Sequence, residues 1–475
     1  MSKFFYKYGK YFVYAFALLV VALNFSLMFD NVVWGDEAYT VITSKCNVAG
    51  ILQRTYFLDS HPPFYYIWCS FISAPFGHSI PGMHLASLLP FTAGIVLAVT
   101  YLRKKLGDFS AICFIILSGL AFPCCEYNLE IRMYALVFLC LLVCATMSIV
   151  IFDKNKGILP WVVMVLVGVI AAYSHYYGLV SSGLLLFMTG LMYFIRNKKF
   201  TWAYGVISCV SYLVLYSPWM FVLLKQMKDV KGSWWATEVP GVFKLFTVIF
   251  CGDRIKWILI PVVIFLFVFV LCTERKKTKT IAFYGIITFI STACLVITFG
   301  YVVSKLLNPI MELRYMYPLV PLTLMTLMLG IWKFTTYKDS KAIKISVVVF
   351  LIIILGLGLW DFRDYRSTVK EQERVTKETL AIIGEPEEGT VFMATEVQHL
   401  SFTVLQSYYP GFEVLGLNGG NTLEIDENAK SIWRFSLSGE PDYVIEEMER
   451  RGYTYEYLGE GHMAKYNFLW CHYYK

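Results

Sequence analysis

The stretch Trp34-Gly35-Asp36-Glu37-Ala38-Tyr39 places two neighbouring carboxylates just after an apolar and aromatic segment, residues 11–29. A segment of about twenty such residues is long enough to cross a bilayer as a helix. Charged side chains this close to hydrocarbon are costly, and they are usually kept for a function. A second polar stretch, Asp59-Ser60-His61-Pro62-Pro63, follows before the next long apolar segment. We therefore expect the first outer loop, residues 30–80, to carry an active site at the outer face of a membrane.

The composition predicts a polytopic α-helical membrane protein. Of the 475 residues, 57% are hydrophobic and 17% aromatic, a balance that soluble domains rarely have. The segments that we expect to cross lie at residues 11–29, 81–102, 110–125, 132–152, 158–174, 177–195, 201–223, 257–272, 281–303, 315–335 and 345–360. The formal charge of +7 comes from basic residues spread over many short loops, which favours anchoring at the cytoplasmic face over nucleic-acid binding.

Basic residues gather in every second loop between these segments. The clusters are Lys3, Lys7 and Lys10; Arg103-Lys104-Lys105; Lys154 and Lys156; Arg196 with Lys198-Lys199; Arg275-Lys276-Lys277; and Lys338 with Lys341. This alternation fits about eleven crossings with a cytoplasmic N-terminus and an extracytoplasmic C-terminus. Residues 63–74 are apolar but too short to span, so we expect them to form an interfacial helix, preceded by another at 37–56. Short loops and the lack of organelle signals favour a bacterial plasma membrane.

The composition changes at Trp360, which divides the chain into a transmembrane domain, 1–360, and a second domain, 361–475. The second part is polar, rich in glutamate and without a spanning segment. A charged helix is expected at 364–383, and alternating patterns at 390–395 and 453–458 predict strands. We expect a small extracytoplasmic α/β domain, long enough to fold by itself.

The two carboxylates of the opening stretch have two interpretations. On a helix, Asp36 and Glu37 would diverge by about 100° and serve separate roles. One would accept a proton from an attacking hydroxyl, and the other would position the acceptor or a cation. The alternative is that Asp36 only caps the helix that begins after Gly35.

The second polar stretch also has two interpretations. The prolines that follow His61 restrict its backbone to an extended form and start a helix, which fixes an imidazole beside Asp59 in a rigid turn. His61 therefore has either a direct catalytic role or only the role of opening a turn.

Other ionisable residues lie at the outer ends of the expected helices. Glu130 and Arg132 are two apart and cannot share a helical face, so Arg132 is expected to meet a carboxylate of the first loop or a phosphate. Arg314 with Tyr315 suits a lipid phosphate. His175 lies among tyrosines at an outer turn and is either a ligand or a hydrogen-bonded interface residue. The alternative for the arginines is anchoring at headgroup depth.

Taken together, these residues resemble the GT-C membrane glycosyltransferases, specifically the protein O-mannosyltransferase-like family and its bacterial relatives. The resemblance runs from the start of the chain to about Trp360. It is carried by Gly35-Asp36-Glu37, Tyr56-Phe57-Leu58-Asp59-Ser60-His61-Pro62-Pro63, Arg132-Met133-Tyr134-Ala135-Leu136, Ser174-His175-Tyr176-Tyr177-Gly178, and Arg314-Tyr315 with Pro318 and Pro321. Residues 361–475 lie outside it.

The resemblance implies transfer of a sugar from a polyprenyl-phosphate donor to an acceptor hydroxyl of a glycan, lipid or protein, with inversion. Asp36 would then be the general base and Glu37 would support acceptor binding. Arg132 would lie near the donor phosphate or the Asp36 loop, and Arg314 would bind the lipid phosphate. Some relatives use a divalent cation and others do not, so the cofactor stays open; a cation here would be held by Asp36, Glu37 and His175.

Two other functions are weighed against this one. A transporter or flippase of lipid-linked sugars would use the acidic pair as a substrate gate, but it would need polar residues along its path, and the expected helix centres carry almost none. A non-catalytic accessory protein that keeps the fold would be expected to lose part of the polar set, whereas Asp36, His61, Arg132 and Arg314 are all present.

Overall fold

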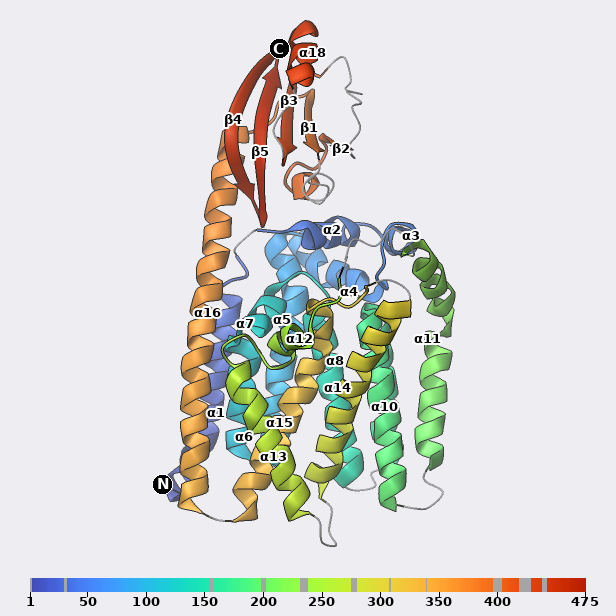
Figure 1. The fold of residues 1–475 in the computed structure, drawn as a ribbon, viewed down its shortest axis with the longest axis vertical. Coiled ribbons are helices and arrows are strands. Elements are labelled where there is room, and N and C mark those ends of the chain that lie inside the picture. The colour runs from blue at the N-terminus through green and yellow to red at the C-terminus, as the bar shows by residue number, and fades with distance from the viewer. Residues whose placement is uncertain are drawn as a thin grey trace.

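The protein is a helical bundle with a small sheet domain at one end, as the computed structural model shows (Figure 1). The structure describes residues 2–29, 32–153, 157–197, 202–230, 238–274, 280–306, 309–338, 340–395, 404–417, 429–437 and 442–475. The N-terminus lies at the end of the bundle opposite the sheet domain, and the long helix α16 (Lys341–Ile383) connects the bundle to the sheet (Figure 1).

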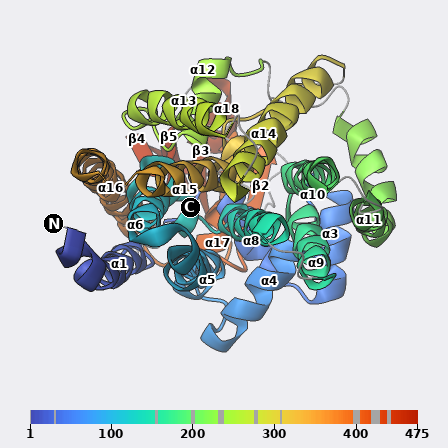
Figure 2. The same ribbon diagram turned by 90° about the horizontal axis from the view of Figure 1, so that it is seen from below.

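Long apolar helices make up the bundle. Among the described residues, nine helices are long and apolar enough to cross a membrane, as expected of a multi-pass membrane protein. Their elements are α1 (Ser2–Phe25), α5 (Ile80–Leu97) continuing through η2 (Ala98–Leu102) into α6 (Arg103–Leu120), α8 (Tyr134–Asp153), α10 (Tyr176–Asn197), α11 (Trp202–Val230), α13 (Lys256–Thr273), α14 (Ile281–Leu306), η3 (Arg314–Leu319) continuing into α15 (Val320–Tyr337), and α16. Helix α8 lies in the middle and packs against α5, α9 (Leu159–Ser174), α10, α14 and α15 (Figure 2).

The expected number of crossings agrees with this bundle once a turn at Gly107 is counted. Gly107 has φ 84° and ψ 167°, a conformation that glycine adopts without strain, and it separates the expected segments 81–102 and 110–125. The remaining expected segment, 158–174, is the shorter helix α9. The prediction of a multi-pass helical membrane protein is therefore confirmed, with nine helices of the described residues long and apolar enough to cross.

The first long loop differs in detail from the expectation. It holds three helices, α2 (Gly35–Ser44), α3 (Val48–Phe57) and α4 (Phe64–Ser73), followed by the short turn η1 (Ala74–Phe76). The prediction of a single helix at 37–56 was wrong, because the Asn47 side chain caps a new helix there by accepting a backbone N–H at 2.9 Å. Helix α4 is the short helix expected at 63–74, and one of its faces packs into the bundle. Its Tyr65 is fully buried, and Trp68 donates to the Ala86 carbonyl at 2.8 Å.

The C-terminal domain is a five-stranded mixed sheet with strand order β2-β1-β3-β5-β4. The strands are β1 (Thr390–Thr395), β2 (Glu413–Leu417), β3 (Ser431–Ser436), β4 (Thr454–Met463) and β5 (Tyr466–Tyr474), and two helices join them, α17 (Gln406–Tyr408) and α18 (Asp442–Arg450). Strand β1 pairs in parallel with β2 and β3, while β5 pairs antiparallel with β3 and β4. The small α/β domain predicted from the sequence is therefore present, and the boundary expected at residue 360 falls inside α16.

Polar contacts hold α16 to the loops at the sheet end of the bundle. Arg254, between α12 (Val242–Ile249) and α13, lies 2.7 Å from both Asp361 and Asp364 of α16. Asp361 also accepts the backbone N–H of Phe122, at the start of α7 (Phe122–Leu129), at 3.4 Å. These contacts fix the helix that carries the sheet domain against the loops that surround the first long loop.

Candidate active site

Helix α2 begins with a residue that cannot cap it through its side chain. The N-cap residue is Trp34, whose indole offers no acceptor to the free N–H groups of the first turn. Glu37 satisfies a neighbouring donor instead, because its Oε2 accepts the backbone N–H of Trp34 at 3.3 Å. The aligned peptide dipoles of α2 also favour the two acidic side chains of this turn. Asp36 and Glu37 are therefore held at the start of one rigid helix.

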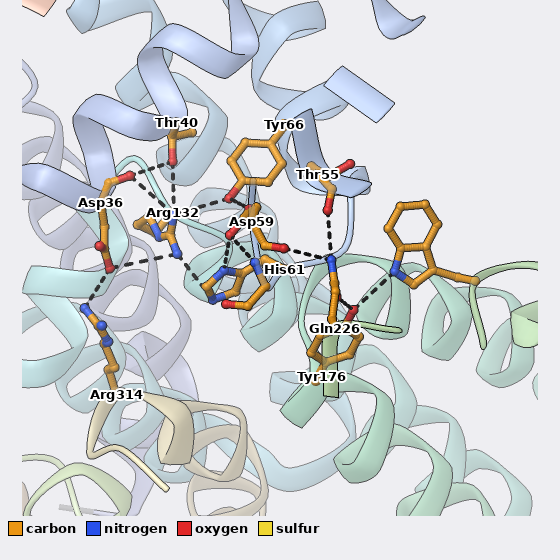
Figure 3. A network of polar contacts seen from close by, with 12 residues as sticks. Asp36, Thr40, Thr55, Asp59, His61, Tyr66, Arg132, Tyr176, Gln226 and Arg314 are labelled. Atoms are coloured by element: carbon orange, nitrogen blue, oxygen red, sulfur yellow. Dashed lines mark hydrogen bonds and ion pairs between the residues drawn. The ribbon is translucent and has the colours of Figure 1, made fainter. Parts of the chain in front are cut away.

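Asp36 faces two guanidinium groups (Figure 3). Its Oδ2 lies 2.8 Å from Nη1 of Arg314 and 3.9 Å from Nη2 of Arg132. Arg314 begins η3, and Arg132 lies in the loop between α7 and α8, so three segments far apart in the sequence meet here. The Asp36 side chain is 22% exposed. The two arginines stabilise the ionised carboxylate while leaving it open to a ligand.

Arg132 is the centre of this polar network. Its Nη1 donates to the Asp36 carbonyl and to the Thr40 hydroxyl, both at 3.3 Å, and to the Tyr66 hydroxyl at 3.4 Å. Its Nη2 lies 3.4 Å from Nε2 of His61. Because the residue is only 2% exposed, its charge needs these partners to offset the cost of desolvation. Removing the guanidinium would leave the whole network without its shared donor.

Asp59 orients His61 within the network. One carboxylate oxygen lies 2.9 Å from Nδ1 of His61, and the other accepts the Tyr66 hydroxyl at 2.5 Å. Burial by itself would raise the pKa of Asp59, but His61 and Arg132 outweigh burial and hold the pKa below its ordinary value. An ionised Asp59 accepts a hydrogen bond from Nδ1–H of His61, which leaves Nε2 of His61 to accept a hydrogen bond from Arg132.

A cavity of about 450 Å³ begins beside this network. His61, His175 and Tyr315 form its polar end, with ring centres 4.9 Å apart between His175 and Tyr315 and 5.6 Å apart between the two histidines. Most of the remaining lining comes from apolar side chains of α10, α11 and α14, namely Leu179, Val180, Leu223, Met227, Phe299, Val303 and Leu306. The lining is completed by Ser60, Tyr176, Tyr177, Gln226 and Ile310. The cavity therefore joins a polar end to a mainly apolar wall.

His175 is a neutral group at the polar end. Burial holds the pKa of His175 well below its ordinary value, and the guanidinium charges of Arg132 and Arg314 lower this pKa further. Its Nδ1 accepts the backbone N–H of Tyr177 at 3.0 Å, so its proton resides on Nε2. His175 is therefore a hydrogen-bond donor to a ligand rather than a cation.

Several residues of the network were missed by the sequence analysis. Gln226 of α11 donates to the carbonyls of Thr55 and Asp59 at 2.8 and 2.9 Å, and it accepts the Tyr176 hydroxyl (Figure 3). Tyr66 was also missed. In the sequence, Gln226 could have been noticed as an amide between the lysines at the end of its helix. Tyr66 could not be told apart from the aromatic residues around it.

Glu37 and Glu130 turn away from this cavity into a second, smaller one. The carboxylate of Glu37 accepts the backbone N–H of Ile131 at 2.8 Å, and that of Glu130 accepts the indole N–H of Trp34 at 2.9 Å. Both side chains line a cavity of about 80 Å³ that also contains Glu126 and Lys465. Burial raises the pKa of Glu37 to about 7 and that of Glu130 to about 8. Glu37 was expected to support acceptor binding, and Glu130 was a further candidate from the sequence for binding the substrate; their positions support neither role.

The ligand set considered for a divalent cation, Asp36, Glu37 and His175, does not fit one. The carboxylate of Asp36 faces Arg132 and Arg314, and Glu37 points into the other cavity. Within the described ranges, no three His, Cys, Asp or Glu side chains are grouped so that they could hold a metal ion. No chemical step is therefore assigned to a metal.

The fold is shared with solved structures. ArnT from Cupriavidus metallidurans in the apo state has a TM-score of 0.60 with 13% sequence identity, over 97% of each chain. ArnT bound to undecaprenyl phosphate has a TM-score of 0.54 with 12% identity, over 97% of this chain and 98% of that chain. The archaeal oligosaccharyltransferase AglB from Archaeoglobus fulgidus, in complex with an inhibitory peptide and a dolichol-phosphate, has a TM-score of 0.51 with 10% identity, over 90% of this chain and 70% of that chain.

This chain has the GT-C fold of those proteins. At identities of 10–13% the likeness establishes the fold, and the chemistry has to be argued from the site. No protein-family model and no curated protein matches the chain.

Proposed function

We propose that the protein is a glycosyltransferase that moves a monosaccharide from a polyprenyl-phosphate donor to an acceptor hydroxyl, with inversion at the anomeric carbon. The reaction would take place at the membrane face that carries the sheet domain, which the basic loops of the sequence assign to the outside of a plasma membrane. The donor class is supported by two neighbours of the same fold, one bound to undecaprenyl phosphate and one in complex with a dolichol-phosphate.

The observation that carries this proposal is the position of Asp36. Its carboxylate lies between Arg314 and Arg132, next to the polar end of a cavity whose remaining walls are mainly apolar. A prenyl chain needs an apolar channel, its phosphate needs cations, and an acceptor hydroxyl needs a base. The three requirements meet at one place in this structure.

The reaction would proceed in one displacement. The acceptor hydroxyl gives its proton to Asp36 as its oxygen forms a bond to the anomeric carbon. The bond from that carbon to the phosphate oxygen breaks, and the electron pair leaves with the lipid phosphate. Arg314 stabilises the growing negative charge on that phosphate. Because one carboxylate acts from the opposite face of the sugar, there is no covalent intermediate and the configuration inverts.

The salt bridge between Asp36 and Arg314 gives donor binding a second effect. A donor phosphate competes with Asp36 for the guanidinium of Arg314, since both are anions at the same cation. Binding of the donor would thereby release one carboxylate oxygen for the acceptor proton. The neutral imidazole of His175 would donate to the sugar or the phosphate without adding another positive charge.

A panel of donors tests the proposal. Purified protein in detergent is given polyprenyl-phosphate mannose, glucose, galactose or aminoarabinose with a set of acceptor alcohols, and lipid phosphate and glycosylated alcohol are measured together. We expect one donor to yield lipid phosphate and glycosylated alcohol in equal amounts. This is the reaction that the resemblance to the protein O-mannosyltransferase-like family implies. Failure of every donor to yield either product, with protein that stays folded, would contradict the proposal.

A further inference from the structure

The hairpin between β4 and β5 reaches from the sheet domain to the first residue of α2. The hydroxyl of Tyr466 accepts the backbone N–H of Gly35 at 3.1 Å, across a separation of 431 residues in the chain. Gly35 is the residue before Asp36, and its N–H is one of the first-turn donors that the helix itself cannot satisfy. Since Trp34 has no side-chain acceptor, the cap comes from the other domain.

The neighbouring Lys465 makes a second connection to the same place. Its Nζ lies 4.8 Å from the ring centre of Trp34 and 3.3 Å from a carboxylate oxygen of Glu126. The guanidinium carbon of Arg314 lies 5.4 Å from the centre of the same Trp34 ring, and Arg314 pairs with Asp36. Two successive residues of the hairpin thus contact the surroundings of Asp36. Tyr466 binds the backbone of Gly35, and Lys465 lies over the indole ring of Trp34.

The hairpin is held in this position by α16. Thr376 accepts the backbone N–H of Ala464 at 2.8 Å, and Thr379 donates to the carbonyl of His462 at 2.6 Å. Both threonines are buried. Ala464 has φ 54°, the conformation that a two-residue hairpin turn takes at its first position. Contacts with α16 therefore hold this turn and the two residues that follow Ala464.

We propose that Tyr466 is a positioning residue for Asp36, and that the sheet domain completes the active site by capping α2. The expected effect on kcat rests on the proposed function. The expected effect on the structure at the start of α2 rests on the geometry alone. The hydroxyl of Tyr466 fixes the backbone at Gly35, which fixes the first turn of α2 and the direction of the Asp36 carboxylate. Donor binding depends instead on Arg314 and the apolar cavity.

The variant Tyr466→Phe removes the hydroxyl and keeps the ring. Loss of a helix cap typically makes the capped conformation about tenfold less favourable. We therefore expect kcat to fall about tenfold, while KM for the lipid donor stays within about twofold. The matched control is Tyr457→Phe, because the Tyr457 side chain belongs to the same sheet and is 55% exposed. We expect wild-type kcat and KM from that control.

Amide hydrogen exchange supplies a readout that does not depend on activity. In Tyr466→Phe, the backbone amides at the start of α2 should exchange about tenfold faster than in the wild type, and those of α8 should be unchanged. Equal exchange at α2 in Tyr466→Phe and wild type would overturn the inference, even if the enzyme is active. A wild-type protein that turns over no donor but shows the exchange difference would overturn only the proposed function.

The double variant Thr376→Val/Thr379→Val keeps Tyr466 and loosens the turn. It should lower kcat and speed exchange at α2 in the same direction as Tyr466→Phe. A fall in the midpoint of thermal unfolding with kcat and exchange at the wild-type level would assign these threonines to the sheet domain alone and contradict the argument that α16 sets the hairpin.

Discussion

Two neighbouring residues, Asp36 and Glu37, belong to regions of opposite charge balance. Asp36 lies with Arg132 and Arg314, so that two guanidinium groups meet one partly exposed carboxylate. Glu37 is 5% exposed and shares a small cavity with Glu126 and Glu130, where Lys465 is the one lysine or arginine in the lining. Adjacent positions on a helix point about 100° apart, which is enough to send the two carboxylates into these two regions.

The difference separates a chemical role from a structural one. The cationic region keeps its carboxylate ionised and accessible, as a base requires. The acidic region raises the pKa of its carboxylates by burial and uses their oxygens to accept N–H groups of Trp34 and Ile131. An acidic pair in a sequence therefore need not be a pair of catalytic groups.

The largest effect is expected from removing the shared cation. Arg132→Met should lower turnover by about a thousandfold, because Asp36 and Asp59 lose their common partner and His61 loses its donor. Turnover is measured as release of lipid phosphate at saturating donor. Arg132→Lys, which keeps the charge but not the planar fork, should recover only part of the activity. An Arg132→Met variant with more than a tenth of wild-type turnover would contradict the role of Arg132 as the shared cation of this region.

A smaller loss is expected at the second guanidinium. Arg314→Met should reduce kcat/KM for the lipid donor about a hundredfold, because the donor phosphate loses its direct cation in both the bound and the transition state. The matched control is Arg374→Met, which removes an exposed guanidinium of α16 that pairs with Glu371 and Glu378 of the same helix. That control should leave kcat/KM unchanged; a comparable kinetic loss in both variants would contradict the assignment of Arg314.

The buried carboxyl groups of the acidic region should make the stability of the folded protein depend on pH. The folded state holds a proton on Glu130 up to about pH 8, whereas the unfolded chain releases it near pH 4.5, so stability falls as the pH rises between these values. In Glu130→Gln this fall should be smaller, and the variant should unfold about 3–5 °C higher than wild type at pH 8.5. Part of the slope that remains comes from Glu37, whose contribution should end near pH 7. Parallel pH curves for the two proteins would contradict this account of Glu130.

Most of the bundle was predictable from hydrophobic patterning. Each apolar segment proposed from the sequence is helical, because a spanning helix satisfies its own backbone hydrogen bonds and is defined by length and hydropathy alone. The strand predicted at 390–395 is β1, for the same reason of simple alternation. The break at Asn47 and the burial of Tyr65 were not predicted, because they depend on a cap and on contacts with α5 that periodicity does not encode.

The polar residues of the site were visible from the sequence, but their division between the cationic and the acidic region was not. The placement of Asp36, Asp59, His61, Arg132, His175, Arg314 and Tyr315 in one network follows from their position at the ends of spanning helices. The direction of Glu37 and Glu130, and the contribution of Gln226 and Tyr466, depend on packing between segments that are far apart in the chain. Nothing local in the sequence reports such contacts.

The most direct test compares Asp36→Asn with Glu37→Gln in the same detergent preparation, with single-turnover release of lipid phosphate as the measurement. Our account predicts that Asp36→Asn loses turnover by about a thousandfold while it still binds the donor and stays folded, because only the base is removed. Glu37→Gln should keep turnover within about tenfold, since it weakens one hydrogen-bonded contact at the start of α2. Wild-type turnover in Asp36→Asn, or an equal loss in both variants, would contradict the claim that Asp36 alone of the two carboxylates takes the acceptor proton.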